Sequence, residues 1–144
     1  MEHVIEKSND ADLADLEAKR TWVLNHFDPD SRHKYQDLNE KLRLLEVIVR
    51  EGWVGKDETL KLQCLGVTFG DALAQSLGME WVTVIDEYGR DSALRKAGTT
   101  IVIFPLTMIS KRVERGEIVN IAALFESTTK TVREMEGNLA YLLN

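Results

Sequence analysis

Asp71 is the polar residue whose position in the sequence is best suited to chemistry. It follows Leu60, Cys64 and Val67 at helical spacing, so its carboxylate is expected to be partly buried on an apolar helix face. A buried carboxylate needs a cation or several hydrogen-bond donors, and such groups often belong to functional sites. The interpretation that we favour is an ion pair that holds helix to sheet, with its partner among Arg95, Lys111 and Arg112.

A second group of charged side chains surrounds a turn that follows a strand-like segment. Asp86, Glu87 and Asp91 place three acids close together, with Arg90 between them. Oxygen ligands of this kind could bind a divalent cation or form an acid/base pair. The spacing of a calcium loop is absent, and turn residues are usually polar because turns are solvated. We therefore favour a solvated turn and predict no metal site here.

Three basic residues, Lys111, Arg112 and Arg115, lie within about one helical turn of each other. Such a group could recognise a phosphate or a carboxylate, since arginine gives bidentate contacts. Glu114 and Glu117 dilute this positive charge. A solvated outer helix face with salt bridges is therefore the favoured interpretation.

No known catalytic or cofactor motif is complete in this sequence. His26 and His33 match no standard zinc spacing, and Cys64 has no histidine near it in the sequence. No phosphate-loop, dinucleotide-binding, GxSxG or HExxH motif occurs. We therefore predict no cofactor and no metal, and we interpret Cys64 as a buried structural thiol.

The longest apolar pattern predicts a central helix over residues 57–77, capped by Asp57 and ended by Gly78. Two apolar faces indicate that this helix lies inside the core. Gly66 and Gly70 lie on a ridge of small residues on this helix. Glycine inside a helix costs up to about 1 kcal/mol relative to alanine, so we expect the ridge to let another segment approach closely.

Strand character is found in three segments, residues 81–85, 92–96 and 99–104. The last is the strongest β-branched run of the chain, and turn chemistry separates the three segments. Short turns between consecutive strands favour an antiparallel meander. Pro105 ends the last strand and favours the start of a helix directly after it.

Helices flank this meander in the sequence on both sides. A polar lead-in to about Asp10 precedes a helical hairpin, whose second helix is capped by Ser31. A last helix begins near Asn120, and Gly137 is a candidate break in it. The sequence thus predicts an α+β fold with an N-terminal helical hairpin, a central helix, a three-stranded antiparallel meander and two C-terminal helices. We expect one domain, made of a hairpin (1–56), an α+β core (57–125) and a C-terminal helix (126–144).

The composition limits the partners that the chain can have. Its 144 residues fit one domain, and its formal net charge of −6 argues against a protein that grips nucleic acid by phosphate neutralisation. A single cysteine forms no internal disulfide and is consistent with a reducing compartment. No signal-like start and no apolar run of membrane-helix length is present. We expect a soluble, acidic, cytoplasmic protein that binds neither nucleic acid nor membrane.

The segment around Asp71 resembles a bacterial family known as domain of unknown function 3806. The resemblance covers about residues 60–125, and four groups of residues carry it: LGVTFGDAL from Leu65, EWV from Glu80, DEYG from Asp86 and FPLTMISKR from Phe104. It implies a bacterial origin and the fold of that family, and it implies no activity. The helices before residue 57 lie largely outside it.

Two functions from different classes remain open. The first, which we favour, is a non-catalytic protein-binding module such as an adaptor, an inhibitor or an immunity-like protein, because no catalytic set is visible. The N-terminal helices could also form a homodimer. The second is a small enzyme or ligand-binding domain with its site around Asp71, Asp86, Arg95 and Arg112. The residues predicted to bind a ligand or a partner are Asp71, Trp81, Asp86, Glu87, Arg95, Lys111 and Arg112.

Overall fold

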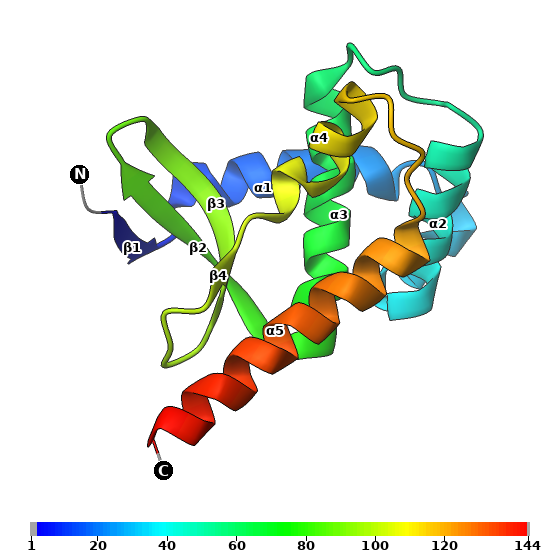
Figure 1. The fold of residues 1–144 in the computed structure, drawn as a ribbon. Coiled ribbons are helices and arrows are strands. Elements are labelled where there is room, and N and C mark those ends of the chain that lie inside the picture. Colours follow the sequence, from blue (N-terminus) through cyan, green and yellow to red (C-terminus); the bar gives the residue numbers. More distant parts are fainter. Residues whose placement is uncertain (1–2, 144) are drawn as a thin grey trace.

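The computed structural model describes residues 3–143, with side chains described up to residue 139. Helices pack beside a small antiparallel sheet, so the predicted α+β fold is confirmed (Figure 1). The elements in chain order are β1 (Val4–Lys7), α1 (Asp10–Leu24), the 3-10 helix η1 (Pro29–Gln36), α2 (Leu38–Arg50), α3 (Thr59–Leu77), β2 (Met79–Asp86), β3 (Gly89–Lys96), β4 (Val102–Ile103), the 3-10 helix η2 (Pro105–Thr107), α4 (Met108–Glu114) and α5 (Ile121–Leu143). Figure 1 shows α3 upright in the centre, with the sheet on one side and α2 on the other.

Helix α3 is the interior element of the fold, as its two apolar faces predict. Phe69, Leu65 and Leu73 are fully buried, and the core cluster around them takes in side chains from α1, α2, α4 and α5. The helix ends at Gly78, which adopts the left-handed conformation with φ of 65° and donates its N–H to the carbonyl of Ala74 at 2.9 Å. The N-terminal cap is Glu58 rather than Asp57, and its side chain makes no capping hydrogen bond.

Two glycines of α3 bring neighbouring segments close to its backbone, as predicted. A Cβ atom on Gly66 would lie 2.6 Å from both the Cα and the carbonyl oxygen of Leu106, which belongs to η2. A Cβ atom on Gly70 would lie 2.5 Å from the indole ring of Trp81 and 3.0 Å from Pro105. Since real Cβ atoms do not approach other atoms so closely, both positions require glycine for this packing.

The sheet has one strand more than expected in the described residues. Its order is β1-β2-β3-β4, and every neighbouring pair is antiparallel. The segment expected to be a polar lead-in contains β1, which pairs with the far half of β2 so that Ile5 lies opposite Val84. The expected strand over 99–104 is reduced to the two residues of β4, because residues 96–101 form a turn in which Thr99 donates its N–H to the carbonyl of Lys96 at 3.1 Å.

The two faces of the sheet differ in what covers them. Trp81 and Thr83 alternate with Glu80 and Val82 along β2, so these two pairs point to opposite faces. The hydroxyl of Thr83 donates a hydrogen bond to Asp12 on α1 at 2.9 Å and accepts one from the hydroxyl of Ser8 at 3.0 Å, which places this face against α1. The opposite face carries a separate small cluster, formed by Ile5, Val82, Val84, Ala93 and Val102.

The helices near the two ends of the chain differ from expectation in their boundaries. The 3-10 helix η1 occupies residues 29–36, so α2 begins later than predicted, and Asp37 rather than Ser31 caps it through its side chain. At the other end, α5 passes through Gly137 without a break. The expected boundary between residues 125 and 126 therefore lies inside a continuous helix.

Across residues 3–143, no helix combines the length and the apolar character needed to cross a membrane.

Candidate functional site

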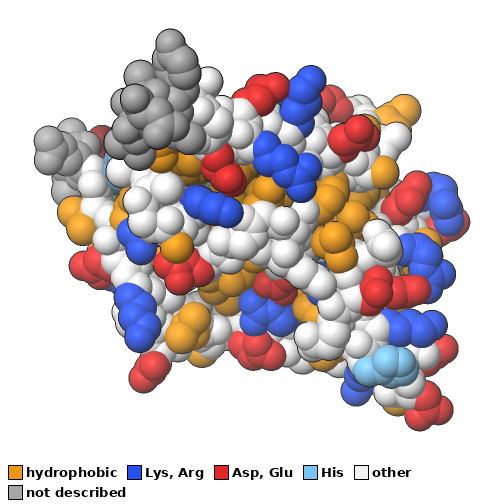
Figure 2. Space-filling model, turned by 90° about the horizontal axis from the view of Figure 1, so that it is seen from below, with side chains coloured by type: hydrophobic (Ala, Val, Ile, Leu, Met, Phe, Trp, Pro, Cys, Tyr) orange, Lys and Arg blue, Asp and Glu red, His pale blue; other side chains and the backbone are white. Residues whose placement is uncertain are grey.

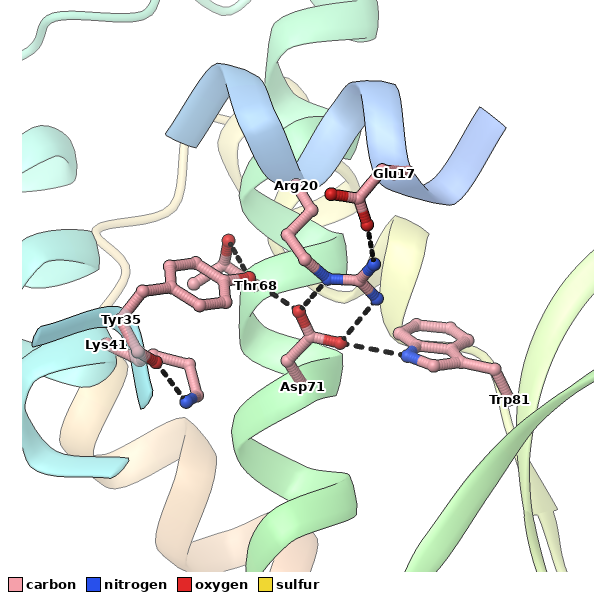
Figure 3. Close-up of polar contacts among 7 residues, drawn as sticks. All are labelled: Glu17, Arg20, Tyr35, Lys41, Thr68, Asp71 and Trp81. Atoms are coloured by element: carbon pink, nitrogen blue, oxygen red, sulfur yellow. Dashed lines mark hydrogen bonds and ion pairs between the residues drawn. The ribbon is translucent and has the colours of Figure 1, made fainter. Parts of the chain in front are cut away.

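The carboxylate of Asp71 lies at the meeting point of four elements (Figure 3). Arg20 of α1 binds it in a bidentate way, with Nε 2.6 Å from Oδ2 and Nη2 2.9 Å from Oδ1. Tyr35 of η1 donates its hydroxyl to Oδ2 at 2.5 Å, and the indole N–H of Trp81 on β2 donates to Oδ1 at 2.9 Å. Each oxygen thus accepts two hydrogen bonds, which fills the carboxylate's acceptor positions.

The side chains that make these hydrogen bonds are largely shielded from water. The side chain of Asp71 is 13% exposed and that of Arg20 is 25% exposed, and Tyr35 is buried. The hydrogen bonds that Arg20 donates to Asp71 raise the pKa of Arg20 above its usual range. Burial, and next the nearby charge of Asp71, raises the pKa of Tyr35 well above its ordinary value. The group therefore holds a charged pair and a neutral phenol in fixed positions.

A cavity of about 480 Å³ opens beside this network, and Lys41 and Gln75 line it together with Arg20 and Asp71. Lys41 donates its ammonium to the carbonyl of Tyr35 and lies 4.9 Å from the centre of that ring. Burial lowers the pKa of Lys41, against the opposing effect of the charge on Asp71. Because every lone-pair position of Asp71 is occupied, this carboxylate cannot accept a substrate proton without breaking the network.

The expected ion pair of Asp71 is present, but its cation is Arg20 and not one of the three proposed residues. Arg95 lies opposite Glu80 in the register of β2 and β3 and forms an ion pair with it at 3.5 Å. Since Glu80 and Trp81 point to opposite faces of the sheet, Arg95 lies on the face away from Asp71. Its Nε is buried and has no hydrogen-bond partner among the described residues.

The other residues predicted to form a site lie apart from Asp71. Asp86 ends β2 and accepts the N–H of Tyr88 at 2.8 Å, and Glu87 lies in the β2–β3 turn that follows. Lys111 and Arg112 lie on α4. The structure therefore brings Asp71 and Trp81 into contact and leaves the remaining predicted residues at three separate places. Within the described chain, no group of three or more metal-ligating side chains is present.

A polar cleft that sequence reasoning missed lies between α1, β3 and η2, with a volume of about 590 Å³. Asp12 lines this cleft, and its Oδ2 accepts hydrogen bonds from Arg90 Nη2 at 2.6 Å and from the N–H of Asn9 at 2.9 Å. The hydrogen bond from Arg90 lowers the pKa of Asp12 below its usual range. The sequence signal for part of this arrangement was the capping box formed by Asn9 and Asp12 at the start of α1.

An apolar groove of about 480 Å³ lies between α2, α3 and the segment that joins α4 to α5. Its apolar lining includes Val49, Val54, Leu62, Val113, Ile118 and Val119. Ile118 is 99% exposed, and Trp53 and Leu60, which lie near in sequence to lining residues, are 52% and 66% exposed. Trp53 stacks on His26 at a ring distance of 6.1 Å, and half of its surface is free. We call this feature the α2–α3 groove.

The fold and these sites define a small α+β protein with a buried polar centre and an apolar groove. The chain belongs to the family described as a domain of unknown function (DUF3806), because the profile of that family matches residues 41–125, more than half of the chain. The match begins at Lys41, so it takes in most of α2 as well as the segment in which the resemblance was noticed.

A solved structure supports the fold assignment. The chain is similar to a protein from Bacteroides thetaiotaomicron VPI-5482, whose crystal structure was determined at 1.50 Å resolution, with a TM-score of 0.71 and 20% sequence identity. The similarity covers 89% of this chain and 47% of that chain, so this chain spans less than half of the length of its neighbour. No curated protein matches the sequence.

Proposed function

We propose that this protein is a non-catalytic protein-binding module of the bacterial cytoplasm, and that it binds its partner in the α2–α3 groove. The observation that carries the proposal is Ile118, a large aliphatic side chain that is 99% exposed at an apolar groove. Burying such a side chain contributes about 1.5–3 kcal/mol, which is typical of an anchor residue in an interface. The single free thiol of Cys64 supports a reducing compartment.

The charges around the groove indicate the chemistry of the partner. Glu46 and Glu117 line the groove, with Glu117 3.5 Å from Arg115, and the third charged lining residue, Arg50, is 3.5 Å from Glu51. The net balance at this place is negative, in keeping with the overall charge of −6. We therefore expect the occupant to be a protein segment with one or two large apolar side chains flanked by lysine or arginine.

The enzyme alternative has weaker support. It required Asp71, Asp86, Arg95 and Arg112 to converge, and these four residues lie on α3, on the β2–β3 hairpin and on α4. Asp71 is occupied by four hydrogen bonds, and Arg95 points to the other face of the sheet. Acid/base or nucleophilic catalysis needs reactive groups that converge in one pocket, and the separation of these four residues speaks against such a site.

The proposal is tested by selecting displayed random peptides on the immobilised protein and titrating a selected peptide against three forms. The forms are the unchanged chain, Ile118→Asp in the groove and Tyr88→Asp on the β2–β3 turn, where Tyr88 is 89% exposed. We expect basic-flanked apolar peptides to be selected and their affinity to fall by about tenfold or more in Ile118→Asp only. Both substitutions are at the surface, so the thermal midpoints should stay close to that of the unchanged chain.

Two outcomes count against the proposal. One is that no peptide is selected above background, and the other is that selected peptides bind the Ile118→Asp form as tightly as the unchanged chain. A homodimer through the N-terminal helices stays a separate prediction. Light scattering of the free protein over a range of concentrations decides it, and a dimer that the Ile118→Asp substitution dissolves would mean that a second copy occupies the groove.

A further inference from the structure

A shallow basic trough lies between α4 and α5, apart from the α2–α3 groove, with a volume of about 420 Å³. Its lining includes Phe104, Met108, Lys111, Arg112, Arg115 and Leu124. All of the charged residues in this lining are cations. We propose that this α4–α5 trough binds a small organic anion with a phosphate group attached to an apolar part.

The helix α4 presents the cations on one side. Lys111 and Arg112 follow Met108 by three and four residues, and Arg115 follows them by four and three, so each of these cations has helical neighbours among the lining residues of this side. Arg112 is fixed at the trough, because its Nη1 donates to the carbonyl of Met108 at 2.9 Å. The other N–H groups of this guanidinium are left for a ligand, and a guanidinium suits the bidentate recognition of phosphate oxygens.

Of the two acids near this face, Glu114 is engaged elsewhere and Glu117 pairs with Arg115 alone. Glu114 accepts a hydrogen bond from the hydroxyl of Thr59 at 3.1 Å, which directs it toward the start of α3. Glu117 is 3.5 Å from Arg115, and within the described residues no carboxylate forms an ion pair with Lys111 or Arg112. The salt-bridged outer face expected from the sequence is thus present only at Arg115.

This local positive charge stands out against the rest of the molecule. The chain carries a net charge of −6, and Figure 2 shows a lower face on which acidic and basic side chains are mixed around a band of hydrophobic ones. A trough whose charged lining is all basic concentrates a positive potential and attracts anions. A phosphate dianion gains more from three cations than a monoanion does.

The apolar part of the ligand is indicated by the opposite wall of the trough. Phe104 is 43% exposed, and Met108 and Leu124 lie beside the cations in the same lining. An aromatic or aliphatic group attached to the phosphate would cover this surface while its phosphate meets Lys111, Arg112 and Arg115. We therefore expect phenyl phosphate to bind more tightly than inorganic phosphate.

The test is a titration of the ¹⁵N-labelled protein with phenyl phosphate, inorganic phosphate and phenol, followed by NMR and calorimetry. Phenyl phosphate should shift the amide signals of residues 104–115 and 124–128, and phenol should not. The affinity should fall by about tenfold or more in the Lys111→Ala/Arg112→Gln double variant. The matched control is Arg43→Gln, which removes an exposed arginine on α2 and should leave the affinity unchanged.

The experiment also separates this inference from a purely structural role of the cations. Lys111 and Arg112 lie in the last turn of α4, where the helix dipole favours positive charge, so the double variant can lower the thermal midpoint. A lower midpoint with no binding of phenyl phosphate to the unchanged chain overturns the inference. Equal loss of affinity in Arg43→Gln, or shifts spread over the whole surface, overturns it too. The Ile118→Asp form should bind phenyl phosphate normally, so failure of the groove proposal leaves this result intact.

Discussion

The indole of Trp81 lies so close to Gly70 that any side chain at that position would collide with the ring: a Cβ atom there would be 2.5 Å from Cη2 and 2.6 Å from Cζ2. The indole N–H donates to Asp71, the next residue along α3, at 2.9 Å. The glycine therefore allows the ring to reach the carboxylate. The hydrogen bond from Trp81 to Asp71 therefore depends on the close packing of the indole against Gly70.

Replacing the glycines of α3 by alanine should destabilise the protein in a graded way. Gly66→Ala should lower the free energy of unfolding by about 2 kcal/mol, because the new methyl group meets the backbone of Leu106, which cannot move away alone. Gly70→Ala should cost about 1 kcal/mol, because the Trp81 ring can tilt at the expense of its hydrogen bond. Urea denaturation with unchanged m-values measures both effects.

Gly137 provides the matched control for these substitutions. It lies inside α5, and nothing comes within 4 Å of the Cβ atom that alanine would add. Gly137→Ala should therefore raise stability, by up to about 1 kcal/mol from helix propensity. If Gly66→Ala were as stabilising as Gly137→Ala, the close approach of η2 to α3 would be wrong.

Asp71→Asn should lower the free energy of unfolding by about 2–3 kcal/mol, because it leaves the partly buried guanidinium of Arg20 with Glu17 as its remaining partner. In the variant that also carries Arg20→Met, the second substitution should cost little more, since the two residues act as a pair. Chemical denaturation of the four members of this double-mutant cycle measures the coupling. Asp86→Asn at the β2–β3 turn serves as a control and should change stability by less than about 0.5 kcal/mol. Additive effects of the two substitutions would contradict the pairing.

Tyr35 should make the protein lose stability in alkaline solution. Its pKa is raised in the folded protein, first by burial and then by the charge of Asp71, from an ordinary value of 10.0. Above pH 10 the unfolded chain therefore releases the phenolic proton while the folded protein keeps it, so stability falls as the pH rises and is unaffected by this group below that pH. Tyr35→Phe should remove this part of the slope.

Denaturation curves recorded on both sides of pH 10 for the two forms test the prediction for Tyr35. At neutral pH, Tyr35→Phe should cost about 1 kcal/mol for the hydrogen bonds lost to Asp71 and Thr68. An identical alkaline slope in both forms would show that the phenol titrates normally in the folded protein.

The central helix could be predicted because its signals are local. The apolar spacing over residues 59–77 defines two faces, and Gly78 supplies the left-handed residue with which helices end. The two glycines at 66 and 70 also had a local meaning, since glycine inside a helix is costly unless a neighbour comes close. Strand β2 was predictable for the same reason, from its run of β-branched and aromatic residues.

The edges of the sheet could not be predicted, because their pairing depends on distant residues. Strand β1 has four residues, and its partner Val84 lies far along the chain from Ile5. Strand β4 lies in a strongly β-branched run, yet only Val102 and Ile103 find partners on β3. Strand propensity describes what fits a pleated surface and does not say whether a neighbouring strand is there.

The partner of Asp71 was missed although the sequence contained a signal for it. Arg20 interrupts the apolar spacing of Leu13, Leu16 and Leu24, so it lies on the face of α1 that turns toward the core. A partly buried cation needs an anionic partner, and Asp71 was the carboxylate that was expected to need a cation. The cations on β3 and α4 were predicted because Asp71 was expected to hold the central helix to the sheet, and the spacing within one helix does not say which other helix its polar face meets.

The position of Arg20 and Tyr35 has a consequence for how small the protein can be made. The family profile begins at Lys41, so both residues that donate to Oδ2 of Asp71 precede it. A fragment limited to residues 41–125 would expose the side of α3 that carries Asp71. It would also leave this carboxylate without its counter-ion, Arg20. We therefore expect the smallest fragment that folds on its own to extend beyond the stretch matched by the family profile and to reach back at least into α1.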